Sequence, residues 1–306
     1  MLDMNEIHKG TCAIIVTYEP DKTRLNALID SLLSQVESVV IVDNASKNKE
    51  INEFTKVHNS RISIIALEEN CGVATAQNRG IRWATQQGFY YVLLMDQDSL
   101  PESCMVKHLI AGMKQKTEEG YKVAAVGPKY TDIKGRHASP FVKLKGWELC
   151  RIECLENELV AVDIIISSGS LISIDALVSV GDMTDQLFID YVDTEWCLRA
   201  NYKGYALFGV GAAHMQHDLG DEFTRLFGRT IPVHSSVRNY YIIRNGLWLL
   251  RQSWVSPAWR IMDSIRLFKI YIVCSLFAGN RFTNWKMMNK GIWHSLSGKT
   301  GKLHEG

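Results

Sequence analysis

Apolar residues in the first part of the chain alternate between short continuous runs and helical spacing. The continuous runs, each suited to a strand buried on both faces, are Cys12–Thr17, Val39–Asp43, Ile62–Leu67, Tyr90–Met95 and Val123–Val126. Apolar positions three and four residues apart predict helices around Leu25–Leu33, over 73–87 and over Pro101–Lys116. This alternation is typical of βαβ units, so we predict an α/β fold with a largely parallel sheet.

Beyond these elements the pattern is less regular. Residues 128–160 combine glycine, proline and mixed charge, and they predict only short strand-like pieces. The pattern then predicts strands at Val162–Ser167 and Tyr205–Phe208, a small-residue turn at 168–170 and a helix near 190–203.

The C-terminal region is predicted to be helical. Apolar residues fill most positions between Ile261 and Phe277, with Arg266 and Lys269 among them. Because about 20 uninterrupted apolar residues are needed to cross a bilayer, we predict no transmembrane span. A basic helix near tryptophans suits the plane of a membrane interface, and packing of this helix on the rest of the protein is an equally weighted alternative. We therefore divide the chain into an α/β domain, 1–230, and a basic helical region, 231–306.

Length and composition limit these predictions. A chain of 306 residues accommodates one large domain with an appendage, and 46% hydrophobic with 22% charged residues is typical of a folded protein. The seven cysteines are scattered and lack the close pairs of a zinc site or a disulfide framework. The first residues carry acids and no apolar h-region, so we expect no secretory signal peptide and a cytoplasmic protein.

Charge is divided unevenly along the chain. The net charge is +1, but from Arg225 to the end there are 13 lysines and arginines and only two acidic residues. This asymmetry indicates an anionic partner for the C-terminal part, and membrane headgroups and nucleic acid are the two obvious classes.

Polar residues stand where each of the first four predicted strands ends. They are Thr17 and Tyr18, then Asp43, Asn44 and Ser46, then Glu68, Glu69 and Asn70, and finally Asp96, Gln97 and Asp98. Ligands of open parallel sheets bind beyond the carboxyl ends of the strands, so these residues are candidates for a binding site. Asp43 can accept hydrogen bonds from a ribose or a base, although the same segment is also a good turn.

The segment from Asn70 to Gly80 places a glycine, Gly72, at a helix start and small residues along one helix face. Small residues allow the helix and its backbone amides to approach a nucleotide. Close packing of the helix on the sheet also explains the small residues, but it does not explain Asn70 and Asn78 together.

Asp96 and Asp98 lie one residue apart on a predicted loop, which suits a Mg²⁺ or Mn²⁺ ion that neutralises a diphosphate. The Asp-x-Asp pattern is common, and its place at the end of the fourth strand is what strengthens it. His214 and His217 follow the strand predicted at 205–208, and a histidine there is a candidate for a further ligand. We favour His217, because the turn residue Gly220 follows it.

A second acidic cluster contains Asp190, Asp193 and Glu195 at the start of a predicted helix. A carboxylate in such a cluster can act as a general base. Charge compensation at the helix N-terminus is the structural alternative.

In this order, the clusters resemble the family-2 glycosyltransferases over most of residues 11–246, and most of all the bacterial rhamnosyltransferases. Val42–Ser46, the stretch 70–80 and Asp96–Asp98 carry the family resemblance, whereas 188–196 and Gly291–Lys299 point to rhamnose transfer. The resemblance implies a GT-A type fold, which has a Rossmann-like mixed sheet. It also implies inverting transfer of a sugar from a nucleoside diphosphate to an acceptor.

The resemblance also implies residue roles. The residues expected to hold the nucleotide-sugar are Thr17, Tyr18, Asp43, Asn44, Asn70, Gly72, Asn78, Asp96, Gln97 and Arg244, although an Arg244 on a surface helix is the simpler interpretation. The metal, Mg²⁺ or Mn²⁺, would be bound by Asp96, Asp98 and His217, and Asp193 would be the base. Many relatives have Glu-Asp where this chain has Val192-Asp193, which makes Asp190 a rival for a catalytic or acceptor-binding role.

The donor implied by the resemblance is dTDP-β-L-rhamnose, and the product is then an α-L-rhamnoside. The implied acceptor is a lipid-linked saccharide of cell-envelope polysaccharide assembly, such as an O-antigen intermediate. The irregular pattern of residues 128–160 separately indicates a variable segment on the acceptor side. This acceptor agrees with the basic tail and predicts a peripheral protein at the inner face of the cell membrane. A UDP-hexose donor and an inactive carbohydrate-binding relative are the alternatives, and the oligomeric state is left open, a homo-oligomer included.

Two other classes are disfavoured. A dinucleotide-dependent enzyme needs Gly-x-Gly-x-x-Gly after its first strand, where this chain has Thr17-Tyr18-Glu19-Pro20. A nucleic-acid-binding protein explains the basic tail but gives no purpose to the acids at the strand ends, so we expect no nucleic acid partner.

Overall fold

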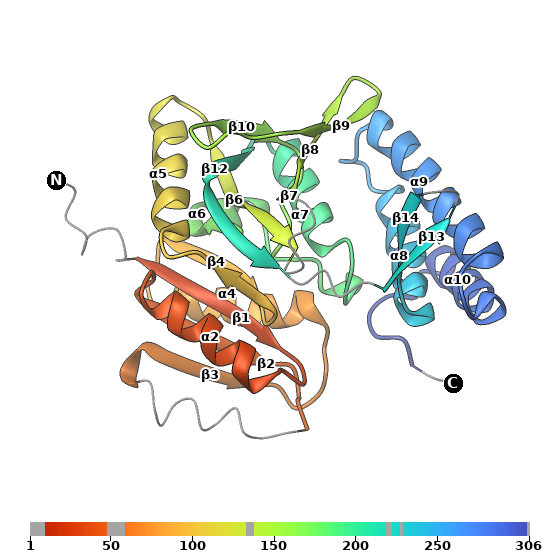
Figure 1. The fold of residues 1–306 in the computed structure, drawn as a ribbon, viewed down its shortest axis with the longest axis horizontal. Coiled ribbons are helices and arrows are strands. Elements are labelled where there is room, and N and C mark those ends of the chain that lie inside the picture. The colour runs from red at the N-terminus through yellow and green to blue at the C-terminus, as the bar shows by residue number, and fades with distance from the viewer. Residues whose placement is uncertain (1–9, 48–58, 133–137, 218–221, 227–228, 305–306) are drawn as a thin grey trace.

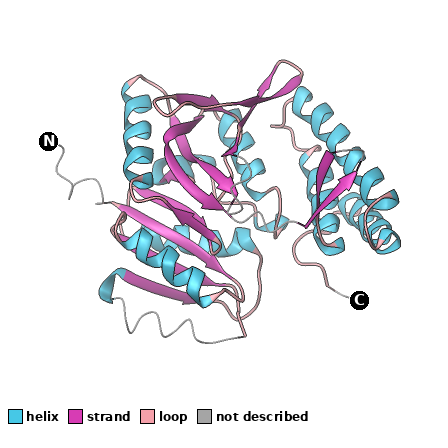
Figure 2. Cartoon of the chain, in the orientation of Figure 1, coloured by secondary structure: helices cyan, strands magenta, loops and turns pink. Residues whose placement is uncertain are grey.

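A computed structural model of the protein describes residues 10–47, 59–132, 138–217, 222–226 and 229–304. A mixed sheet forms its centre, helices lie on both faces of the sheet, and a group of three helices lies to one side (Figure 1). Strands and helices alternate through the first part of the chain, whereas the last part is mainly helical (Figure 2).

The strands are β1 (Thr11–Thr17), β2 (Ser38–Asp43), β3 (Ile62–Ala66), β4 (Tyr91–Asp96), β5 (Ser99–Pro101), β6 (Val123–Asp132), β7 (Ala138–Ser139), β8 (Phe141–Lys145), β9 (Glu148–Ile152), β10 (Leu159–Val162), β11 (Leu171–Ser173), β12 (Ala206–His217), β13 (Glu222–Leu226) and β14 (Arg229–Val233). The α-helices are α2 (Lys22–Leu33), α4 (Val73–Gln86), α5 (Met105–Glu118), α6 (Ile174–Val180), α7 (Val192–Tyr202), α8 (Ser236–Leu249), α9 (Pro257–Leu276) and α10 (Arg281–Leu296).

The main sheet has the order β10-β12-β6-β11-β4-β1-β2-β3, with β5 also paired to β12 and β7 to β6. Strand β1 is parallel to β2 and β4, and β2 is parallel to β3. In contrast, β11 runs antiparallel to both β4 and β6. The predicted α/β fold class is confirmed, and the sheet is parallel where the apolar runs predict βαβ units.

Alternate residues of the central strands face opposite layers of helices, as the two-residue period of a strand requires. On β1, Ala13 and Ile15 pack toward α2 and α5, whereas Cys12 and Ile14 pack toward α4, α6 and α7. Helix α4 lies close to the sheet, because a Cβ atom added at Gly80 would come within 2.4 Å of Ile14. The small residues of α4 therefore serve helix packing at this position.

Two predicted elements are wrong at their boundaries. The helix predicted from Pro101 begins at Met105, because Ser99–Pro101 pairs with β12 as strand β5. The strand predicted at Val162–Ser167 is instead β10, which ends at Val162 where its pairing with β12 ends. The apolar run beyond it is a loop with Ile165 buried, and a buried loop has the same apolar signature as a buried strand.

The strand predicted at Tyr205–Phe208 is longer in the structure, since β12 continues to His217 along β6. Both His214 and His217 therefore lie within a strand rather than after one. Residues 138–152 form β7 and the β8–β9 hairpin.

The C-terminal region contains α8, α9 and α10, which pack on one another. The division predicted between 230 and 231 falls inside β14, which pairs with β13. Within the described ranges, no helix is both long enough and apolar enough to cross a membrane.

Candidate active site

The carboxyl ends of β1, β2 and β4 surround a cavity of about 250 Å³, which we call the strand-end cavity. It is lined by Val16, Tyr18, Asn44, Asn70, Gly72, Val73, Asp96, Gln97, Asp98, Phe188 and Ile189. The structure thus brings six of the ten residues predicted to hold the nucleotide-sugar to one cavity, namely Tyr18, Asn44, Asn70, Gly72, Asp96 and Gln97. The other four, Thr17, Asp43, Asn78 and Arg244, do not line it.

Thr17 and Asp43 directly precede the cavity residues Tyr18 and Asn44 but do not line the cavity themselves. They are opposite one another in the parallel pairing of β1 and β2, and the Thr17 hydroxyl donates a hydrogen bond of 3.0 Å to Asp43 Oδ1. Asp43 also accepts hydrogen bonds from the backbone N–H and the hydroxyl of Ser46, at 3.0 and 2.6 Å. Both side chains are buried, so in this structure they shape the turn after β2.

The amides on the wall bond to neighbouring chain segments. Asn44 donates to Asn70 Oδ1 at 3.1 Å and accepts from the backbone N–H of Cys71 at 2.9 Å. Gln97 accepts from the backbone N–H of Tyr18 at 2.8 Å and donates to its carbonyl at 3.1 Å. These contacts join the end of β2 to the end of β3 and the end of β4 to the end of β1. The half-exposed Tyr18 ring remains on the cavity surface.

Asp96, Asp98 and His217 form the cluster in the described part of the chain that could hold a metal ion. One ligand atom from each residue lies within 4.8 Å of the others. Two carboxylates and an imidazole are hard and borderline donors that suit Mg²⁺ or Mn²⁺. Because β12 runs beside β5, which directly follows Asp98, the pairing of distant strands builds this cluster.

Two buried serines orient the cluster. Ser168 accepts from the backbone N–H of Asp96 at 3.1 Å and donates to the Ser99 hydroxyl at 2.7 Å. The Ser99 hydroxyl in turn lies 2.7 Å from His217 Nδ1. In contrast, His214 points to Glu156, with 3.0 Å between its Nε2 and the carboxylate.

A second cavity of about 400 Å³, which we call the carboxylate cavity, adjoins the first. The two cavities share Val73, Asp96 and Ile189, so they form one continuous space. The residues of the carboxylate cavity include Tyr130, Ser167, Asp190, Tyr191, Asp193, His217 and Arg238. The metal cluster and both rival acids therefore face the same space, although they lie about a hundred residues apart in sequence.

Burial dominates the electrostatics of these acids. It raises the pKa of Asp96 to about 6, where nearby His217 opposes the rise and the charges of Asp98 and Asp193 add to it. Burial also raises the pKa of Asp193, while hydrogen bonds from the backbone N–H groups of Thr194 and Ser167 oppose the rise. The carboxylates are thus crowded in a poorly solvated space, which favours a bound cation.

Asp190 differs from Asp193 in its partners. Arg238 Nε donates to Asp190 Oδ1 at 3.1 Å, and this pairing partly offsets the rise in the pKa of Asp190 that burial causes. Asp193 instead has Oδ1 bonded to the Thr194 N–H at 2.7 Å, and its Oδ2 has only a long contact of 3.4 Å from the Ser167 N–H. Asp193 is therefore the carboxylate that has no cationic partner in these contacts.

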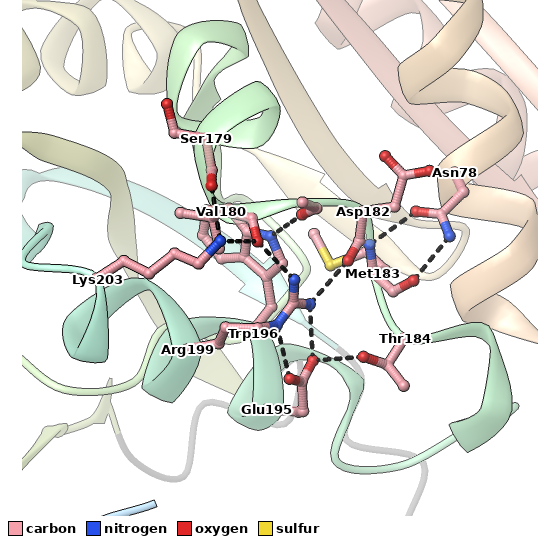
Figure 3. Close-up of polar contacts among 11 residues, drawn as sticks. Asn78, Ser179, Val180, Asp182, Met183, Thr184, Glu195, Trp196, Arg199 and Lys203 are labelled. Atoms are coloured by element: carbon pink, nitrogen blue, oxygen red, sulfur yellow. Dashed lines mark hydrogen bonds and ion pairs between the residues drawn. The ribbon is translucent and has the colours of Figure 1, made fainter. Parts of the chain in front are cut away.

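The segment that precedes Asp193 is held by buried side chains from two helices (Figure 3). Asn78 of α4 exchanges two hydrogen bonds with the backbone of Met183, at 2.8 and 2.9 Å. Glu195 of α7 is fully buried, pairs with Arg199 at 2.7 Å and accepts from the Thr184 hydroxyl at 2.8 Å. Asn78, which was predicted to hold the nucleotide, lies outside both cavities in this structure and holds the backbone of this segment. The third acid of the cluster belongs to an internal ion pair.

Arg244 lies in the interior, away from both cavities. Its guanidinium lies 5.4 and 4.9 Å from the ring centres of Tyr240 and Tyr241, and it donates to the carbonyls of Leu187 at 2.9 Å and Gly301 at 2.5 Å. It is buried, so neither a surface position nor a place beside the diphosphate describes it in this structure.

Asn245 completes the support of the segment that precedes Asp193, residues 183–191, which we call the acidic segment. Its side-chain amide donates to the carbonyls of Leu187, Ile189 and Asp190, at 2.9, 2.7 and 3.0 Å. The backbone there is unusual, because Phe188, Asp190 and Tyr191 all have positive φ, between 60° and 67°. Only the polar pair Arg244-Asn245 inside an apolar helix signals this role in the sequence.

Comparisons with known proteins place this site in a family. The family model described as Glycosyl transferase family 2 matches residues 12–177. The chain is 35% identical over 295 residues to the dTDP-rhamnosyl transferase RfbF of Shigella flexneri, which covers 94% of this chain and 95% of that protein. The chain belongs to glycosyl transferase family 2, and it is a glycosyltransferase.

Solved structures show the same fold at low sequence identity. A structure of GalNAc-T7 with UDP, GalNAc and Mn²⁺ has a TM-score of 0.62 at 14% identity, and the match covers 92% of this chain and 55% of that one. A structure of S. aureus TarS 1-349 has a TM-score of 0.60 at 14% identity, with 93% and 80% covered. The fold is therefore of the GT-A type.

Proposed function

We propose that the protein transfers L-rhamnose from dTDP-β-L-rhamnose to a saccharide acceptor with inversion at the anomeric carbon. The observation that carries this proposal is the shared space in which Asp193 faces the cluster of Asp96, Asp98 and His217. The donor follows from the dTDP-rhamnosyl transferase that is 35% identical over nearly the whole chain. The strand-end cavity would take the nucleotide, since it lies beyond the carboxyl ends of parallel strands.

Mg²⁺ or Mn²⁺ would be held by Asp96, Asp98 and His217, whose oxygen and nitrogen donors suit either ion. When bound, such an ion supplies positive charge to the departing diphosphate. Among the nucleotide-site residues, Tyr18, Asn44, Asn70, Gly72 and Gln97 are the ones that we propose contact the donor, because they line the cavity.

Asp193 is the proposed base. Its Oδ2 accepts the proton of the acceptor hydroxyl. At the same time the oxygen of that hydroxyl forms a bond to C1 of rhamnose, on the face opposite the diphosphate. The bond between C1 and the diphosphate oxygen breaks, and its electron pair leaves with dTDP. An α-L-rhamnoside results. Asp190 remains paired with Arg238 and shapes the acceptor side of the cavity.

We further propose peripheral attachment to the inner face of the cell membrane, where a lipid-linked acceptor would be presented. Helix α9 exposes Ile261, Ile265 and Phe268 along one stripe, and α10 exposes Phe282 and Trp293. Between 257 and 302 there are eight lysines and arginines and a single acid, Asp263, which is bonded to Arg266. Apolar and cationic groups together suit an anionic lipid surface.

The test is to incubate purified protein with dTDP-rhamnose or UDP-hexoses, an octyl glycoside acceptor panel and Mg²⁺ or Mn²⁺. We expect a rhamnose mass increment and release of dTDP with dTDP-rhamnose alone, and loss of both in Asp193→Asn. Turnover with a UDP-hexose would overturn the donor. Donor binding without turnover with any sugar would identify an inactive carbohydrate-binding relative. Flotation with phosphatidylglycerol vesicles, compared with phosphatidylcholine vesicles, tests the membrane proposal separately.

A further inference from the structure

A third cavity, of about 340 Å³, lies between the β8–β9 hairpin and helices α8 and α9, and we call it the hairpin–helix cavity. The hairpin reaches toward α9 across the space between the main sheet and the C-terminal helices (Figure 1). Val142 and Leu149 line it from the hairpin, and Ile242 and Trp259 line it from the helices. Neither the proposed donor site nor the proposed base accounts for this cavity.

The hairpin–helix cavity continues from the carboxylate cavity, because Asp190, Tyr191 and Arg238 line both. At the start of α7, Asp193 faces the carboxylate cavity and the next residue, Thr194, faces the hairpin–helix cavity. A ligand whose reacting hydroxyl lies at Asp193 can therefore extend past Asp190 into the third cavity.

The polar groups of this cavity include one unpartnered donor and one unpartnered acceptor. Trp259 is only 6% exposed, and its buried Nε1–H has no hydrogen-bond partner in the described part of the chain. Asp190 Oδ2 is likewise buried and unpartnered there, although Oδ1 is bonded to Arg238. Buried polar groups are normally hydrogen-bonded, so these two indicate a ligand that supplies both acceptors and donors.

The charges of the cavity argue against an anionic occupant. Arg238 is paired with Asp190, and Arg266 is paired with Asp263 at 2.7 Å. Arg266 also donates to the Tyr191 hydroxyl, which donates to Asp263 at 2.7 Å. The two cations are thus balanced by carboxylates in a fixed network, and a neutral ligand fits this arrangement better than a phosphate.

We infer that the hairpin–helix cavity is a subsite for a second, neutral sugar residue of the acceptor. Sugar hydroxyls both donate and accept, and the apolar faces of a pyranose ring suit the side chains of Leu149 and Trp259. The preferred acceptor is then at least a disaccharide, with its terminal sugar at Asp193 and the adjoining sugar in this subsite. This inference rests on the proposed glycosyl transfer.

The first experiment compares octyl monosaccharides with the octyl disaccharides that extend each of them, using dTDP-rhamnose as donor. We expect kcat/KM to be at least about tenfold higher for one of the disaccharides than for its terminal monosaccharide, the gain of one or two hydrogen bonds. Leu149 is partly exposed and lines the cavity, so the larger side chain of Leu149→Trp should fill the cavity. This variant should lose the preference for the disaccharide and keep the wild-type rate on the monosaccharide.

The matched control is Leu155→Trp, because Leu155 is 66% exposed and lies outside the cavity. This variant should keep the preference for the disaccharide. An equal loss on both acceptors in Leu149→Trp, or wild-type protein that never prefers a disaccharide, would overturn the subsite while transfer itself persists. Absence of transfer to every acceptor and from every donor would instead count against the proposed function.

A second experiment reads the subsite without turnover. The indole N–H resonance of Trp259, assigned by its disappearance in Trp259→Phe, should shift when the preferred disaccharide is added and stay in place with the monosaccharide. Trp259→Phe keeps an aromatic ring and loses one donor, so kcat/KM for the disaccharide should fall about fivefold. An indole resonance that shifts with a monosaccharide carrying an octyl diphosphate, and not with the disaccharide, would assign the cavity to a phosphate and overturn the inference.

Discussion

The two walls of the active site are built in different ways. The wall at the strand ends comes from the first 98 residues, and its key contacts follow from sheet register, as when Thr17 and Asp43 are opposite each other in β1 and β2. The wall that carries Asp190 is an irregular segment held by α4, α7, α8 and the residues around Gly301.

The residues of the two walls are therefore positioned by different interactions. In the strand-end wall, backbone pairing positions the residues, and side-chain hydrogen bonds only refine it. In the acidic segment, three residues with positive φ are held by buried side chains such as Asn245, because such backbone is costly without external support. Substitutions in the two walls should therefore fail in different ways.

The largest expected effect is on chemistry. Asp193→Asn removes the proposed base but keeps the shape of the side chain, so kcat should fall about a thousandfold. The Kd for dTDP, measured by calorimetry, should stay within a factor of about two of the wild-type value, because the substitution leaves the nucleotide contacts in place. Asp190→Asn is the matched comparison, and a larger loss of kcat in this variant would exchange the roles of the two acids.

The next effect is on stability. Arg244→Met leaves the buried carbonyls of Leu187 and Gly301 without their donor, so the free energy of unfolding should fall by about 3 kcal/mol. Arg251→Met is the control, since Arg251 is more exposed and its guanidinium donates to the carbonyl and the hydroxyl of Ser295. Denaturant unfolding measures both variants, and equal losses would show that the acidic segment does not depend on Arg244.

Removal of the metal tests the cluster that joins the strand-end wall to β12. Asp98→Asn should lower activity about a hundredfold at limiting Mg²⁺ or Mn²⁺, because it weakens a cluster built from β4, β5 and β12. Excess ion should recover part of the loss, whereas EDTA should abolish wild-type activity. His214→Ala is the control, since His214 points to Glu156, and an activity that EDTA leaves intact would contradict the metal site.

The pH dependence of kcat/KM tests whether Asp193 or Asp190 is the base. Burial raises the pKa of Asp193, and the base is active as the carboxylate, so activity is present above that raised pKa and lost as the pH falls through it. With metal saturating, kcat/KM should fall about tenfold per pH unit below a pKa that lies above the ordinary value of 3.8. Asp190→Asn should keep this acid limb, and its disappearance there would assign the titration to Asp190.

The smallest effect belongs to the strand-end half. Gly80→Ala places a Cβ against Ile14 and forces α4 away from β1, so the free energy of unfolding should fall by about 1 to 2 kcal/mol. At temperatures where the variant remains folded, its kcat should stay near the wild-type value. Gly88→Ala gives the comparison without a packing clash, although its own positive φ carries a backbone cost.

Much of the fold could be predicted from the sequence, and part of the site could not. The runs at β1 to β4 and the intervening helix patterns predict the parallel part of the sheet, because periodicity depends on neighbouring residues alone. The long strand β12 was predicted to end at Phe208, since the residues from Gly209 to Gln216 include glycines and polar residues that do not alternate clearly. Asn78 and Arg244 were predicted to contact ligand, yet the structure uses them to hold the acidic segment.

The sequence by itself determined the α/β class, the four strand ends with their polar residues, and the two acidic clusters. Those features depend on the order of residues along short segments. Only the tertiary structure decided that Asp98 and His217 meet, that Asp193 faces them while Glu195 is locked to Arg199, and that a third cavity opens beside Asp190. These outcomes depend on which distant strands pair and on which buried group finds a partner, and local patterns carry no information on either.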